Sequence, residues 1–325
     1  MKSAVHATFG EPTEVLVFGE SAMPQPGSSQ VRIKTILSPI HNHDLWTVRG
    51  SYGYKPELPA IGGTEAVGII DALGEGVTGL TIGKRVAVAS VHGTWAEYFL
   101  APAAVLVPVP DAISDGAAAQ LIAMPFSAIA LLEYLEVKSG DWIIQNTANG
   151  AVGKTLAMLA AGRGINVVNL VRRDAGIEEL AAVGISNAVS TATNGWQNRV
   201  REITKGAAIR AAVDSIGGKA SGELLSLLGD NGLLVSFGTM AGDPMALSSG
   251  DLIFKQAVVK GFWGSKISAA MPGATKARLI GELLRLVSGG ELKLPVEAVF
   301  GLDQIADAVT ASLSPGKAGK VLLKP

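Results

Sequence analysis

Residues 143–155 read IIQNTANGAVGKT, an apolar run followed by a glycine-containing turn and a stretch with helical periodicity. A helix that begins directly after such a turn points its N–H groups and positive dipole end at the turn, which suits a phosphate group. Gly150 would let the backbone approach a pyrophosphate, and Gly153 would let the helix pack closely on the strand. Although the usual fingerprint has three glycines, the strand-turn-helix context favours a dinucleotide site over a merely tight turn.

The end of the next expected strand, residues 165–171, indicates which dinucleotide is preferred. NAD-binding folds place Asp or Glu about twenty residues beyond the first glycine, where it accepts from ribose hydroxyls. Here Val171 occupies that position, and Arg172 and Arg173 follow directly. Because a guanidinium fork matches phosphate oxygens, we expect NADPH. NAD is the alternative if the arginines only end a solvated loop, with Asp174 offsetting their charge.

The stretch HNHD contains His41, His43 and Asp44, a combination that suggests a metal site. A two-residue spacing serves one face only, however, and catalytic zinc takes three protein ligands. The chain has no cysteine, which excludes disulfides, thiolate catalysis and cysteine-based zinc sites. We therefore expect no bound metal. We expect His41 and His43 to line a cleft or form hydrogen bonds within it, and His6 and His92 to be structural.

Composition limits the remaining function classes. The chain has 325 residues, 48% of them hydrophobic, and a formal net charge of −1, which indicates two domains and gives no support for binding nucleic acid or an anionic membrane. Residues 116–132 are uncharged but too short to span a membrane, so we expect a buried helix there. The N-terminus lacks the apolar segment of a signal peptide, and we expect a cytoplasmic protein.

The pattern of predicted elements indicates an α/β protein. Short alternating or β-branched runs separated by Gly and Pro turns make residues 1–119 β-rich. In residues 120–264, helical stretches alternate with apolar strands, which is typical of βαβ units and a doubly wound parallel sheet. Residues 265–325 are mixed, and we expect them to fold back onto the first segment.

Four stretches resemble the zinc-independent medium-chain dehydrogenase/reductase superfamily, which includes quinone reductases and trans-2-enoyl thioester reductases. SPIHNHDLWTVRGSYGYKPELPAIGGTEAVG at 38–68 is similar to the active-site floor of the enoyl reductases, and HGTWAEYFLAP at 92–102 to the following strand. FKQAVVKGFWGSK at 254–266 is similar to a strand that lines their cofactor and substrate cleft, and IIQNTANGAVGKT has their form of the cofactor turn. The resemblance implies a GroES-like β-rich catalytic domain with an inserted Rossmann domain.

The resemblance also assigns site residues. Tyr52 matches the tyrosine that donates a hydrogen bond to the substrate oxygen, as a phenol that is protonated at neutral pH can do. Zinc-dependent relatives have Gly-His-Glu where this chain has Gly63, Thr64 and Glu65, so no metal ligand set is expected. The substrate cleft is expected to contain His41, Asn42 and Trp263. The cofactor is expected to contact Asn149, Gly150, Ala151, Val152, Gly153, Arg172, Arg173, Phe262 and Trp263.

These observations predict an NADPH-dependent oxidoreductase that reduces the C=C bond of α,β-unsaturated carbonyl compounds, either 2-enoyl thioesters or enones, without zinc. The alternative is an NADPH:quinone reductase, and lesser alternatives are a zinc-type alcohol dehydrogenase and a non-catalytic NADPH-binding protein. A homodimer formed by strand pairing between cofactor domains is implied by the resemblance. Lys317 and Lys320 are expected to be solvated, and the sequence shows no basic cluster suited to an acyl carrier.

Overall fold

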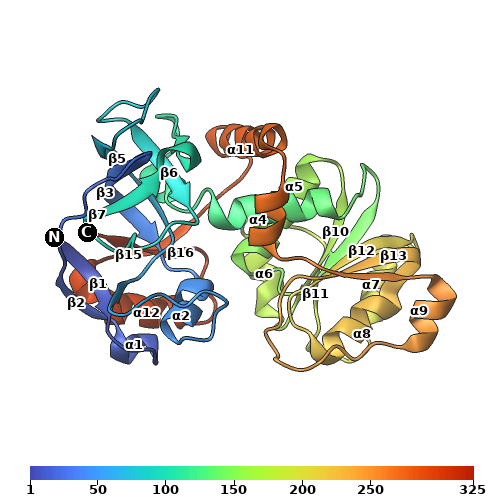
Figure 1. Cartoon of the computed structure of the whole chain (residues 1–325). Helices are drawn as coiled ribbons and strands as arrows, with labels where there is room; N and C mark the ends of the chain where they lie inside the picture. Colours follow the sequence, from blue (N-terminus) through green and yellow to red (C-terminus); the bar gives the residue numbers. More distant parts are fainter. The chain divides into compact units, whose positions relative to one another are not determined.

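The computed structural model describes residues 1–325 and divides into two compact units (Figure 1). The first unit combines Met1–Ala123 with Leu283–Pro325, and the second is Met124–Glu282. The boundaries expected from the sequence lie after residues 119 and 264. The first is close to the observed boundary after Ala123, and the second lies well before the observed boundary after Glu282.

The second boundary falls inside helix α11 (Gly273–Ser288). Arg278 of this helix pairs with Glu133 at 2.9 Å, and Glu282 pairs with Arg163, also at 2.9 Å. Both partners belong to the second unit, so the first part of α11 belongs with them. Ion pairs between residues more than a hundred positions apart give no local sequence signal, which explains why the expected boundary is too early.

The first unit is mainly antiparallel β-structure. Its larger sheet has the order β15-β16-β3-β5-β6-β8, with β7 also paired to β3, and a smaller sheet has the order β2-β1-β4. Strand β16, at the C-terminus, pairs with β3, where Leu322 opposes Pro39. The core between the strands contains Val31, Ile33 and Phe99, all almost fully buried, as expected where one face of an alternating strand packs inward.

The elements of the first unit cover most of its residues. The strands are β1 (Lys2–His6), β2 (Val17–Glu20), β3 (Gln30–Pro39), β4 (Ala60–Ile61), β5 (Glu65–Leu73), β6 (Arg85–Ala89), β7 (Tyr98–Pro102), β8 (Val107–Pro108), β15 (Val296–Gly301) and β16 (Lys320–Lys324). The helices are α1 (Pro12–Val15), α2 (Asn42–Val48), η1 (Ala103–Val105), α3 (Asp115–Ala118), η2 (Leu302–Gln304) and α12 (Ile305–Leu313).

The second unit is a parallel sheet with the order β11-β10-β9-β12-β13-β14 and helices packed on it (Figure 1). This is the Rossmann order, in which all strands are parallel and the order in which they are added to the sheet reverses between β9 and β12. In such sheets, ligands bind at the carboxyl ends of the strands at that point. The predicted fold class, a β-rich domain with a doubly wound parallel-sheet domain, is confirmed.

The elements of the second unit alternate between helix and strand. The strands are β9 (Trp142–Gln145), β10 (Asn166–Val171), β11 (Ala188–Ser190), β12 (Ile209–Asp214), β13 (Leu228–Ser236) and β14 (Val258–Gly261). The helices are α4 (Ala123–Tyr134), α5 (Ala151–Gly162), α6 (Ala175–Ala181), α7 (Trp196–Thr204), α8 (Gly218–Leu227), α9 (Ser249–Lys255) and α10 (Gly264–Ala270), followed by α11.

The uncharged stretch 116–132 forms two helical segments instead of the single buried helix expected from the sequence. Between α3 and α4, the Gln120 side chain donates to the carbonyl oxygens of Gly116 and Leu294 at 3.1 and 3.2 Å. Most residues of α4 are buried, and none of the helices is both long enough and apolar enough to cross a bilayer.

Candidate active site and cofactor turn

The glycine turn joins the carboxyl end of β9 to α5. Gly150 is the N-cap of α5 and has extended backbone angles, so the first N–H groups of the helix, those of Ala151, Val152 and Gly153, have no intrahelical acceptor. A side chain at Gly153 would place its Cβ 2.7 Å from both Cα and the carbonyl oxygen of Ala148. This position therefore requires glycine for close packing of helix on turn, and the turn presents free donors of the kind that bind phosphate.

Asn149 and Arg173 are both held by Glu179, a residue that the sequence analysis did not single out. The Asn149 amide donates to the Glu179 carboxylate, and Arg173 pairs with the same carboxylate at 3.1 Å. The Asn149 Oδ1 atom is buried without a hydrogen-bond partner. Arg172 is exposed and forms no ion pair within the chain, so its guanidinium is the one available to a phosphate.

The two arginines are therefore expected to differ in effect. Arg172→Ala should raise KM for NADPH roughly 10- to 100-fold, as expected for loss of one charge-assisted contact. Arg173→Ala should raise it only about threefold, because exposed ion pairs contribute little. Steady-state KM values for NADPH and NADH check this. An equal rise for both cofactors in the Arg172 variant would contradict the assignment of this side chain to the 2′-phosphate.

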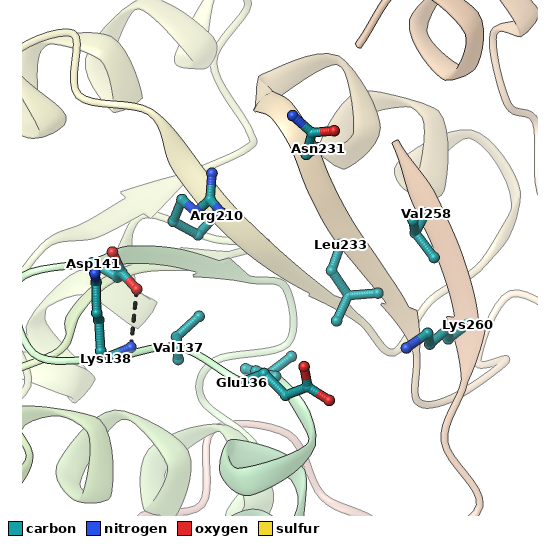
Figure 2. A pocket seen from close by; sticks show the side chains of 10 residues that line it. Glu136, Val137, Lys138, Asp141, Arg210, Asn231, Leu233, Val258 and Lys260 are labelled. Atoms are coloured by element: carbon teal, nitrogen blue, oxygen red, sulfur yellow. Dashed lines mark hydrogen bonds between the residues drawn. The ribbon is translucent and has the colours of Figure 1, made fainter. Parts of the chain in front are cut away.

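A hollow of about 690 Å³ in this unit lies near the amino ends of the strands (Figure 2). Its charged lining residues have both signs and include Arg210, Lys260 and Asp141. Asp141 precedes β9, and Arg210 lies at the start of β12. Since open parallel sheets bind ligands at the carboxyl ends of their strands, the glycine turn is the better cofactor candidate.

His41 and Glu65 form a buried pair in the first unit. His41 precedes α2 as its N-cap, and its Nε2 lies 2.7 Å from Glu65 Oε2. The other Glu65 oxygen accepts the backbone N–H groups of Ile122 and Ala123, both at 2.7 Å. Both side chains are essentially inaccessible to solvent, so the pair connects α2, β5 and the chain before α4.

Burial decides the protonation of this pair. It lowers the pKa of His41 well below its usual value, with a smaller contribution from Lys320. Burial also raises the pKa of Glu65 to about 7, although the two backbone N–H groups oppose the shift. At neutral pH the imidazole of the pair is thus neutral, and the carboxyl group keeps its proton to a higher pH than an ordinary glutamate does. His41 Nδ1 has no hydrogen-bond partner.

The sequence predicted that Lys320 is solvated, and this prediction is wrong. Its side chain is half-buried, and Nζ lies 3.5 Å from the carbonyl oxygen of Ile40. Burial lowers its pKa, while the charges of Asp44 and Glu65 oppose that shift. The lysine comes from β16, which pairs with β3, and therefore reaches the site only through the return of the C-terminal segment. Lys317 is partly exposed, and burial lowers its pKa as well.

Tyr52 lies beside this cluster, in the loop after α2. Its ring centroid is 5.8 Å from that of His43, which in turn stacks on His41 at 5.0 Å. Burial, and then the charge of Asp44, raise the pKa of Tyr52. This raised pKa keeps the phenol protonated at neutral pH. Because the side chain is only partly buried, it can be reached from solvent.

The donor set does not fit a zinc ion. Thr64 and Glu65 lie where zinc-dependent relatives have His and Glu, and the Nε2 atom of His41 is engaged by Glu65. Across the structure, no group of three or more His, Cys, Asp or Glu side chains is placed to hold a metal.

The remaining predicted residues are divided between the units. Asn42 is exposed at the start of α2 in the first unit. Phe262 and Trp263 follow β14 in the second unit, where Phe262 is buried against Tyr134 and Phe237, and Trp263 is 64% exposed. His41, Asn42 and Tyr52 thus belong to one unit, and all cofactor-turn candidates belong to the other.

Comparison with known proteins explains this division. Residues 27–111 match the alcohol dehydrogenase GroES-like domain, and residues 151–278 match the zinc-binding dehydrogenase domain. A human mitochondrial enoyl-[acyl-carrier-protein] reductase is 31% identical over 99% of this chain and 88% of its own length. The chain belongs to the medium-chain dehydrogenase/reductase superfamily. The bovine enoyl-[acyl-carrier-protein] reductase is 32% identical with the same coverage.

Solved structures place the chain in the zinc-independent branch of this superfamily. An Escherichia coli quinone oxidoreductase complexed with NADPH has 25% identity and a TM-score of 0.89, with full coverage of both chains. A quinone oxidoreductase from Pseudomonas syringae has 26% identity and a TM-score of 0.87, again with full coverage. The predicted superfamily is thereby confirmed, and the lack of a zinc ligand set agrees with this branch.

Proposed function

We propose that this medium-chain reductase uses NADPH to reduce the C=C bond of α,β-unsaturated carbonyl compounds, with 2-enoyl thioesters or enones as substrates. The observation that carries the proposal is Tyr52, a partly exposed phenol whose raised pKa keeps it protonated beside a buried polar cluster without metal ligands. The enoyl-[acyl-carrier-protein] reductases that it resembles over 99% of its length support the substrate class.

NADPH, when bound, supplies a hydride to the substrate. The free N–H groups at the start of α5 would hold its pyrophosphate, and Arg172 its 2′-phosphate. The close approach that requires glycine at position 153 keeps that helix end next to the turn. The buried, unpaired Asn149 Oδ1 is a further acceptor for a cofactor group. These features fit a phosphorylated dinucleotide.

Tyr52 would donate a hydrogen bond to the substrate. As hydride reaches the β-carbon of the substrate, negative charge develops on the carbonyl oxygen, and a fixed hydrogen-bond donor near that oxygen lowers the barrier. The phenol O–H of Tyr52 is such a donor. We propose that Trp263 and Phe262 contact the cofactor and that Asn42 contacts the substrate. His41 is inaccessible to solvent and does not reach a substrate directly.

Quinone reduction is the second candidate, because quinone oxidoreductases share the fold over the full chain. A quinone also accepts hydride next to a carbonyl group that gains charge, so the same donor would serve. The two activities differ in whether a saturated carbonyl product forms.

The proposal is tested by mixing chelator-treated protein with NADPH and following absorbance at 340 nm with crotonyl-CoA, a simple enone or a quinone. We expect oxidation of NADPH with the thioester or the enone, unaffected by the chelator. Activity with quinone alone would support the second candidate, and no turnover with any of the three would contradict both.

Two further properties are proposals that extend the sequence analysis. Strand β14 is an edge of the six-stranded sheet, and the nearby side chain of Phe254 is 85% exposed, which supports a homodimer through strand pairing between cofactor domains. Sedimentation equilibrium should give twice the chain mass, and Phe254→Asp should shift it toward the monomer. A monomeric wild type would contradict this. We also propose a cytoplasmic location, which cell fractionation tests.

A further inference from the structure

A chain of hydrogen bonds connects three side chains at the start of α2 and β5. His43 Nε2 lies 2.8 Å from Thr64 Oγ1, and Thr64 Oγ1 donates to Asp44 Oδ1 at 2.7 Å. Asp44 also accepts the backbone N–H of His41 at 2.9 Å, which closes the capping box of α2. Since Asp44 is buried, both of its contacts fix the orientation of the first helical turn.

Counting protons along this chain fixes the tautomer of His43. A threonine hydroxyl has one hydrogen and two lone pairs. Thr64 uses its hydrogen for Asp44, so its oxygen can only accept from His43. Nε2 of His43 therefore carries a hydrogen at all times, and proton exchange at this ring takes place at Nδ1.

Several titratable groups surround His43. Asp44 Oδ1 lies 3.5 Å from Nε2. The other titratable groups that face the ring are His41, stacked on it, and Tyr52, tilted against it; Lys320 and Glu65 act on the same cluster. The His43 side chain remains 24% exposed, so it can exchange protons with solvent.

We propose that His43 returns the proton to the α-carbon of the reduced substrate, with Thr64 and Asp44 as positioning residues. This inference rests on the proposed function. Hydride from NADPH forms the new bond at the β-carbon, and the π electrons move to the enolate. The enolate α-carbon then takes the proton from Nδ1 of His43, which becomes neutral and is reprotonated by solvent. One C=C bond, one NADPH and one proton give a saturated product and NADP⁺.

Tyr52 and His43 thereby have separate roles. A phenol with a raised pKa donates a hydrogen bond well but gives up its proton poorly. An imidazolium is a stronger acid than a phenol and gives its proton more readily to a carbon. A site with both groups can stabilise the enolate and then protonate it.

The test uses His43→Gln, which keeps an N–H group for Thr64 but has no titratable proton. On an enone that the wild type reduces, kcat should fall roughly 100-fold, with Kd for NADPH unchanged. Free imidazole should restore part of the rate. Thr64→Val should lower kcat less, and Thr64→Ser should restore it. His92→Gln, which changes a histidine that stacks on Tyr54, is the matched control and should leave kcat unchanged.

The tautomer has its own readout. Nitrogen NMR of ¹⁵N-histidine-labelled protein should show His43 protonated at Nε2, and Thr64→Val should change that signal. A His43→Gln variant with kcat within about threefold of wild type, or a loss that imidazole does not restore, would overturn the proposal. If the wild type itself does not reduce any activated C=C bond, the proposed function fails instead, which the same assay shows before any variant is made.

Discussion

Replacement of Tyr52 by phenylalanine is expected to lower kcat on crotonyl-CoA or an enone about 100-fold, because removing one donor to a developing oxyanion costs about that much. Phenylalanine keeps the ring that packs against His43, so the fold should be retained. Kd for NADPH should stay unchanged, since the cofactor-turn residues belong to the other unit.

Single-turnover measurements separate this effect from binding. KM for the substrate should change less than kcat, because the hydrogen bond strengthens mainly in the transition state. Tyr54→Phe is the matched control, since Tyr54 is 42% exposed and stacks on His92. Equal turnover of the Tyr52 variant and the wild type would make Tyr52 a structural residue and remove the main support for the proposed function.

Loss of the Glu65 carboxylate is expected to have the largest effect on stability. Glu65→Ala leaves the N–H groups of Ile122 and Ala123 and the imidazole of His41 without their acceptor inside the protein. Breaking a buried network in this way costs about 3 kcal/mol or more of unfolding free energy. Denaturant titration, followed by a spectroscopic signal from the first unit, measures this loss of unfolding free energy. Glu65→Gln keeps an acceptor oxygen and should lose less, and equal stability of Glu65→Ala and wild type would contradict the role of the network.

The same pair predicts a specific pH dependence. Taken alone, the raised pKa of Glu65 would make the unfolding free energy fall as pH rises from 4.5 to about 7. The lowered pKa of His41 has the opposite sign, because the unfolded imidazole binds a proton below 6.5 and the folded one does not. Folding transfers one proton from imidazole to carboxyl, so the two contributions largely cancel.

Glu65→Gln removes the contribution of the carboxyl group and leaves that of the His41 imidazole. The unfolding free energy of the variant should rise with pH between about pH 5 and 6.5, by up to about 1.4 kcal/mol per pH unit, while the wild type stays nearly constant over the same range. Denaturant titrations at several pH values check the difference. Parallel pH profiles would show that the pair does not share its proton as described.

Local patterns were sufficient to predict the parallel sheet and the strand-turn-helix geometry around Gly150. The alternation of apolar strands with helical stretches specifies βαβ units, and Gly153 is explained by the strand-turn-helix sequence around it. Ala148 approaches Gly153 so closely that no side chain fits there, which is the physical reason for the glycine at this position.

Tertiary contacts account for what the sequence did not indicate. Glu65 joins His41 to the N–H groups of Ile122 and Ala123, residues that only the fold brings together. Lys320 reaches the same cluster from the last strand. Glu179 lies six residues beyond Arg173, a spacing that gives no helical pairing signal, yet it holds that arginine. Patterns within one element cannot encode such contacts.

The position of the transferred hydride tests the central claim most directly. NADPH with deuterium at both C4 positions would be mixed with crotonyl-CoA or an enone, and the product analysed by NMR and mass spectrometry. We predict deuterium at the β-carbon of a saturated carbonyl product, and solvent-derived hydrogen at the α-carbon. Deuterium at the carbonyl carbon, with the C=C bond intact, would show an alcohol-forming reductase and contradict the account.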